Sequence, residues 1–89
     1  MDEKEMAQIF KVLSVDTRLN IVKALKQKSL CVNALAARLG VSQSAVSQHL
    51  RILKSSGLVA DNRAGYFIHY TLNEEKLKEY LKSINKFLD

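Results

Sequence analysis

A group of hydrogen-bonding side chains lies in the middle of the chain, at spacings that place all of them on one side of an α-helix. Its members are Gln43, Ser44, Ser47, Gln48 and Arg51. Their amide, hydroxyl and guanidinium groups match the donors and acceptors of base edges and phosphates in a major groove. No acidic residue, which would repel phosphate, occurs between positions 42 and 56. The pattern predicts a helix that reads double-stranded DNA by contacting bases, mainly through the two glutamines and two serines.

A second group consists of cations expected to bind mainly phosphate. It comprises Arg51, Lys54, Arg63 and Arg38, and Arg63 is expected at the tip of a hairpin. The 14 Lys and Arg and 9 Asp and Glu give a formal net charge of +5. Residues 27–72 hold five of the basic residues and one acidic residue, so +4 of the net charge falls in this central block. Such a concentration favours a polyanionic partner. His49, in the same segment, is expected either to contact DNA or to serve the structure.

The remaining reactive side chains do not form a catalytic or metal site. The sequence contains no glycine-rich phosphate loop, no nucleophile–base–acid set and no paired carboxylates, so we predict neither an enzyme nor a cofactor. One thiolate, Cys31, cannot build the multi-thiolate shell that soft metals require, and residues 73–89 contain no histidine. Cys31 is interpreted as a small, partly buried hydrophobe, with a redox-sensing thiol or a vestigial ligand as alternatives. His69, among aromatic residues, is expected to pack.

These side chains must be positioned by a run of short elements. Apolar residues at helical spacing predict two helices before position 27, a third over about 32–39 and a recognition helix over about 42–55. Gly40 suits the end of the third helix, and Ser42 and Asn73 are strong N-caps. Either Ser14 or Asp16 is expected to end the first helix and to cap the second. The pattern then alternates, which predicts a β-hairpin wing over about 58–72, with a loop at 61–65 and a last helix over about 74–88. The predicted fold class is mainly α with a two-stranded β-hairpin wing (α+β), a winged helix-turn-helix, in one domain over residues 1–89.

The first and last helices each carry an apolar stripe that a chain of 89 residues has little means of burying alone. The stripes consist of Met6, Ile9, Phe10 and Leu13 at one end and Leu77, Leu81, Ile84 and Leu88 at the other. We predict a homodimer through these terminal helices, because twofold symmetry would place two recognition helices about 34 Å apart on half-sites one helical turn apart.

Several segments resemble the ArsR/SmtB repressors. The run at 14–21, SVDTRLNI, is similar to the opening motif of that family, and LCVNALA at 30–36 is similar to its next helix. The most specific match is LGVSQSAVSQHL at 39–50, followed by LKSSGLV at 53–59 and GYFIHYTL at 65–72. The resemblance implies a homodimeric repressor that occupies an inverted repeat near a promoter and is released by an inducer, which the sequence does not identify. Members that sense thiophilic metals carry Cys-Val-Cys where this chain has Cys31-Val32-Asn33. The family's other common metal site uses His, Asp and Glu of the last helix, which has no histidine here, so neither site is expected.

Two alternatives stay open, and both are tied to specific features of the sequence. A winged helix also occurs as a protein-interaction module, which would require an apolar patch on the recognition helix. A regulator that responds to a redox signal or a small molecule through Cys31 is the other alternative. The single cysteine, the lack of a signal-peptide pattern and the lack of about 20 consecutive apolar residues predict a cytoplasmic protein without membrane contact.

Overall fold

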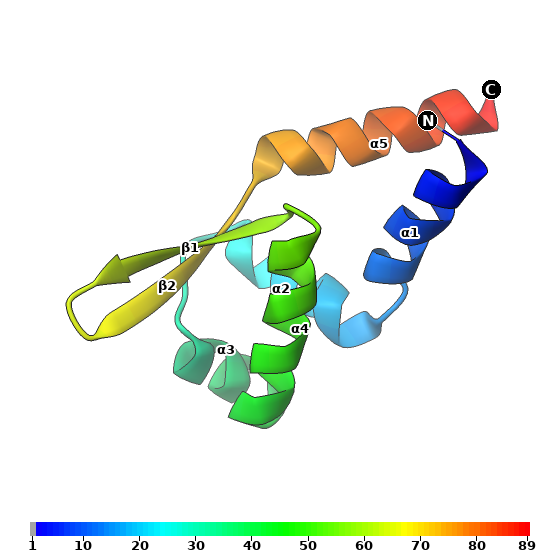
Figure 1. Cartoon of the computed structure of the whole chain (residues 1–89). Coiled ribbons are helices and arrows are strands. Elements are labelled where there is room, and N and C mark those ends of the chain that lie inside the picture. Colours follow the sequence, from blue (N-terminus) through cyan, green and yellow to red (C-terminus); the bar gives the residue numbers. More distant parts are fainter. Residues whose placement is uncertain (1) are drawn as a thin grey trace.

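Five helices and one β-hairpin follow one another in the computed structural model, which describes residues 2–89 (Figure 1). Met1, which the predicted domain included, lies outside the described residues. The elements are α1 (Glu3–Leu13), α2 (Asp16–Leu25), α3 (Val32–Leu39), α4 (Gln43–Ser55), β1 (Val59–Ala64), β2 (Phe67–Leu72) and α5 (Glu74–Leu88). This order confirms the predicted winged helix-turn-helix.

Local side-chain chemistry begins and ends most of these helices where the sequence predicted. Ser42 Oγ accepts a hydrogen bond from the Ala45 backbone N–H at 3.1 Å, and Asn73 Oδ1 accepts one from Lys76 at 3.1 Å. Both bonds satisfy N–H groups that the first turn of a helix leaves without partners. Gly40 adopts a left-handed conformation with φ 69° after α3, as a C-terminal glycine does. The helix-turn-helix therefore takes its bend from Gly40 and Ser42.

The expected N-cap of α2 was wrong, whereas the expected end of the first helix at Ser14 is confirmed. Val15 holds the N-cap position in an extended conformation and makes no side-chain capping bond, so Asp16 is already the first helical residue. Ser14 instead closes α1, because its hydroxyl donates to the Lys11 carbonyl at 2.9 Å.

The hairpin differs from its predicted form in the position of its turn. β1 continues through Ala64, which pairs with Phe67, so the turn consists of Gly65 and Tyr66 alone. Gly65 has a positive φ of 66°, whereas among residues 2–89 no residue other than glycine has positive φ, so φ of Tyr66 is negative. A positive φ followed by a negative one is found in two-residue turns that begin with glycine. The predicted loop at 61–65 was therefore wrong, because residues 61–64 pair with residues 67–70 of β2. Arg63 consequently lies within β1, opposite Ile68, and not at the tip.

A single apolar core holds α4 against the rest of the molecule. Val46, Leu50 and Leu53 on its inner face are at most 1 % exposed, and they pack in one cluster with Leu35 of α3 and Ile21 of α2. At the base of the hairpin, Leu30 pairs with Tyr70 through two backbone hydrogen bonds of 2.8 and 3.2 Å. Burial on this scale fixes which face of α4 points outward, since rotating the helix would expose three large side chains.

The terminal helices α1 and α5 contact each other at one end of the molecule, away from the hairpin (Figure 1). The hydroxyl of the buried Tyr80 in α5 donates to the Ser56 carbonyl at 3.1 Å and ties α5 to the end of α4. Among residues 2–89, no helix has the length and apolar character required to cross a membrane.

The two apolar stripes of these helices are only partly exposed. Met6 and Ile9 are 2 % and 4 % exposed within the single chain, so their side chains have almost no surface left for a partner. Leu13, Leu77 and Ile84 are partly buried against the core. The exposed members are Phe10, Leu81 and Leu88, with 45 %, 53 % and 73 % of their surface accessible.

Candidate nucleic-acid interface

The polar side chains singled out on the recognition helix all lie on the exposed side of α4. We call Gln43, Ser44, Ser47, Gln48 and Arg51 the α4 polar row; every member is exposed. The row occupies the first two turns and continues into the third, while the opposite face of the same helix is buried in the core. The structure therefore brings these five residues together on one surface. Because their donors and acceptors face solvent in the protein alone, they are available to base edges and phosphates.

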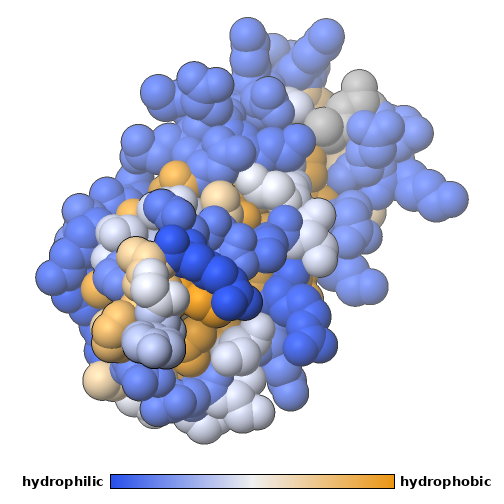
Figure 2. Space-filling view, turned by 60° about the vertical axis from the view of Figure 1, so that its left-hand side comes forward, coloured by the Kyte–Doolittle hydropathy of each residue, from blue (hydrophilic) through white to orange (hydrophobic). Residues whose placement is uncertain are grey.

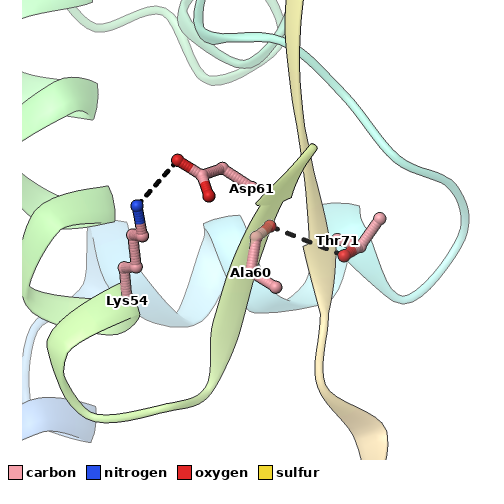
Figure 3. A network of polar contacts seen from close by, with 4 residues as sticks. All are labelled: Lys54, Ala60, Asp61 and Thr71. Carbon is pink, nitrogen blue, oxygen red and sulfur yellow. Dashed lines mark hydrogen bonds and ion pairs between the residues drawn. The ribbon is translucent and has the colours of Figure 1, made fainter. Parts of the chain in front are cut away.

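Lys54, at the C-terminal end of α4, is held by an acidic residue of the hairpin (Figure 3). Its Nζ donates to Asp61 Oδ2 at 2.7 Å, across from α4 to β1. This hydrogen bond, reinforced by the charges of Lys54 and Arg63, lowers the pKa of the Asp61 carboxyl below its usual value. A phosphate contact by Lys54 stays a prediction, and in the single chain its charge is paired with the Asp61 carboxylate.

The same close-up shows how the hairpin is attached beside α4. Thr71 Oγ1 of β2 lies 3.5 Å from the Ala60 carbonyl of β1, next to the Lys54–Asp61 pair (Figure 3). A hollow of about 240 Å³ separates α4 from the strands and is lined in part by Ser47, Arg51 and Tyr70. Two members of the α4 polar row thus border the surface of the hairpin, and the row and the wing form one continuous face.

The hairpin ends in aromatic residues and not in a cation. Tyr66, in the turn, is fully exposed, and its neighbour Phe67 is 64 % exposed. Figure 2, which brings the hairpin side of the molecule forward, shows hydrophobic side chains at the surface among hydrophilic ones. Arg63 is also exposed, two residues before the turn. Tyr66 was expected in the second strand of the hairpin; the glycine of the Gly65-Tyr66 pair was the available signal for a two-residue turn.

His49 does not join the α4 polar row. It is half-buried, and its Nδ1 accepts a hydrogen bond from Arg18 Nε at 3.3 Å. The same guanidinium donates through Nη1 to the carbonyls of Lys11 and Val12, at 3.2 and 3.1 Å. Of the two roles expected for His49, this geometry supports the structural one. No role was expected for Arg18, because nothing in the sequence pattern shows which residues meet across 31 positions of chain.

Arg38 lies on α3, outside the α4 polar row. It is exposed and lines a surface cleft of about 350 Å³ between α2 and α3, which Lys23 and Gln27 also line. A phosphate contact by Arg38 stays a prediction.

The part of the chain that the structure describes contains no group of three or more His, Cys, Asp or Glu residues placed to hold a metal ion. Cys31 is a free, half-buried thiol at the start of α3, and it lines a shallow hollow with Asn33 and the apolar side of the hairpin.

Comparison with known proteins places this geometry among bacterial regulators. Residues 16–61 match the family described as bacterial regulatory protein, arsR family. The chain is 38 % identical to the transcriptional repressor SmtB homolog of Synechocystis over 91 % of its length and 61 % of the relative's. It is 32 % identical to the transcriptional repressor SdpR of Bacillus subtilis, over 94 % of this chain and 93 % of that one. The homodimeric winged helix-turn-helix DNA-binding domain Mb0332 of Mycobacterium bovis is similar in structure, with a TM-score of 0.77 and 28 % identity over 93 % of this chain and 80 % of that one.

The relatives differ in length from this chain. It spans about three fifths of the Synechocystis repressor but nearly all of SdpR. The shared part includes α2, α3, α4 and the start of β1, which the family match covers.

Proposed function

Since this chain belongs to the ArsR family of bacterial regulatory proteins, we propose that it is a sequence-specific repressor that binds double-stranded DNA through α4 and the hairpin. The observation that carries the proposal is the α4 polar row: five exposed hydrogen-bonding side chains on a helix without an acidic residue, held outward by a buried inner face. A helix of this kind fits the major groove, where Gln43, Ser44, Ser47 and Gln48 would contact bases. Arg51 would bind phosphate beside them.

The hairpin extends this interface. Arg63 on β1 and the exposed Tyr66 at the turn would reach the backbone or the minor groove next to the segment that α4 contacts. Lys54 would join the phosphate contacts to the extent that DNA competes with Asp61 for its ammonium group.

The proposed working unit is a homodimer through α1 and α5. Its support is the exposed apolar surface of Phe10, Leu81 and Leu88, together with the homodimeric state of the similar domain from Mycobacterium bovis. Two copies related by a twofold axis would read an inverted repeat. If that repeat overlaps a promoter, the bound dimer would block transcription. Because its target is chromosomal DNA, the proposed site of action is the cytoplasm.

The protein-interaction alternative finds less support on α4. Of the residues described in that helix, Ile52 is the exposed large hydrophobic one, at 39 %, whereas the polar row covers the outer face. Regulation through Cys31 stays an alternative within the DNA-binding proposal, because the thiol is free and half-buried.

The test is selection of bound duplexes from a randomised pool, followed by measurement of affinity for the selected sequence at several salt concentrations. The proposal expects an inverted repeat, a complex of two chains per duplex and an affinity that falls as salt rises. Failure to enrich any sequence, with full binding retained when Gln43 and Gln48 are replaced by alanine, would contradict it. Oxidation of wild type and of Cys31→Ser in the same assay tests the thiol alternative.

A further inference from the structure

Arg18 is the one side chain of residues 2–89 for which the structure records hydrogen bonds to both the first helix and the recognition helix. Its guanidinium sits between the last turn of α1 and the side of α4. The carbonyls of Lys11 and Val12 belong to the last four residues of α1, whose oxygens have no partner within the helix. A cation at this negative end is favourable.

The third bond connects this cation to α4. Arg18 Nε donates to His49 Nδ1, so that nitrogen carries no proton and the neutral ring holds its hydrogen on Nε2. His49 follows Gln48 of the α4 polar row directly, and its neighbours one helical turn away, Ala45, Val46, Ile52 and Leu53, are uncharged. Arg18 is thus the charged group that faces the imidazole from α2. From α1, the carbonyl groups of Lys11 and Val12 lie beside this guanidinium and accept its hydrogen bonds.

We propose that Arg18 and His49 are positioning residues for DNA binding, which set the orientation of α4 relative to α1 by a hydrogen bond that exists only while the His49 ring is neutral. The inference rests on the proposed function, because α1 belongs to the proposed dimer contact and α4 to the proposed DNA contact. In a dimer, the angle between these two helices decides whether both α4 helices meet their half-sites at once. Loss of the link frees α4 to tilt in each protomer and lowers affinity without removing a DNA contact.

The direction in which DNA affinity changes with pH distinguishes a positioning role of His49 from a direct contact of His49 with phosphate. A histidine that touched phosphate would bind DNA more tightly when protonated. Here, protonation of His49 removes the acceptor for Arg18 and places two positive charges side by side. Affinity should therefore decrease when acid protonates the His49 ring.

The experiment compares four variants with wild type on the duplex selected from the randomised pool. His49→Leu removes the acceptor and should bind about tenfold more weakly at every pH, as expected for one hydrogen bond to a charged group. His49→Asn places an amide oxygen where Nδ1 was and should bind like wild type at high pH, with no loss in acid. Arg18→Met should match His49→Leu. His69→Gln is the control, because His69 is the other histidine of the chain and should keep the wild-type pH profile.

A readout without DNA separates this inference from the proposed function. The nitrogen chemical shifts of His49 in the free protein should show an unprotonated Nδ1 at high pH, and Arg18→Met should alter them. If wild type binds no duplex, the proposed function fails. If wild type binds DNA but His49→Leu and Arg18→Met bind equally well, or if acid strengthens binding through His49, the positioning role is refuted.

Discussion

The carboxylate of Asp61 is the acidic group that most directly opposes DNA binding in the proposed interface. It lies 2.7 Å from the ammonium of Lys54, so the two together present no net charge beside the α4 polar row. Asp61→Asn keeps the shape of the side chain and an oxygen that can accept from Lys54, but it removes the negative charge. The variant therefore adds one effective positive charge per protomer at this edge of the surface.

The magnitude follows from counterion release. One additional phosphate neutralised per protomer makes the slope of log affinity against log salt steeper by about 0.9, or by about 1.8 for a dimer. Between 50 and 200 mM salt, the affinity of the variant should then fall about 12-fold more than that of wild type. At low salt the variant should bind more tightly, and the gain should be similar for specific and random duplexes, because phosphate contacts carry no sequence information.

The assay is a fluorescence-anisotropy titration of labelled duplex at four salt concentrations. Glu79→Gln is the matched control: it makes the same change in net charge on α5, where Glu79 pairs with Lys76 at 3.5 Å, outside the α4 polar row and the hairpin. An unchanged slope for Asp61→Asn would refute the placement of Lys54 beside DNA. An equal change for Glu79→Gln would show that net charge alone, and not position, governs the effect.

The remaining predictions concern pH, phosphate contact, assembly and the wing. Because the pKa of Asp61 is lowered, its pair with Lys54 stabilises the folded state fully above the unfolded pKa of about 3.9, and this contribution is lost as the pH falls through the lower folded pKa. The difference in unfolding free energy between wild type and Asp61→Asn should therefore shrink in this acid range. A difference that stays constant with pH would contradict the prediction. Arg51→Gln should weaken binding to all duplexes and flatten the salt slope by about 0.9 per protomer, whereas an effect limited to one sequence would mean that Arg51 reads a base. Leu81→Ala should lower the dimer affinity measured by sedimentation with little loss of thermal stability, because its side chain is half exposed. Leu50→Ala, in the core, should cost about 2–5 kcal/mol of unfolding free energy. A Leu81→Ala protein that loses thermal stability but keeps its dimer affinity would exclude the α5 interface. Tyr66→Ser should weaken DNA binding and leave the melting temperature unchanged, because the ring is fully exposed to solvent in the folded chain. Undiminished DNA binding would show that the turn is not part of the interface.

The helices and the polar face of α4 were predictable from the sequence because their causes are local. Apolar residues at helical spacing select the buried side of each helix, and whatever lies opposite them must face solvent. Ser42, Asn73 and Gly40 act within four residues of their own positions, so their effect on helix ends can be read from the chain directly.

Only the tertiary structure decided which charged and apolar side chains are free. Asp61 neutralises Lys54 because β1 continues beside α4, and that continuation depends on pairing with β2. Met6 and Ile9 are buried because α1 packs within the same chain before any partner arrives. Helical periodicity identifies an apolar side chain that will be buried, but it does not show whether the same chain or a partner buries it. A charge pattern likewise does not show which charged side chains form ion pairs. Contacts between residues distant in the chain depend on how the elements pack, and no local pattern encodes that packing.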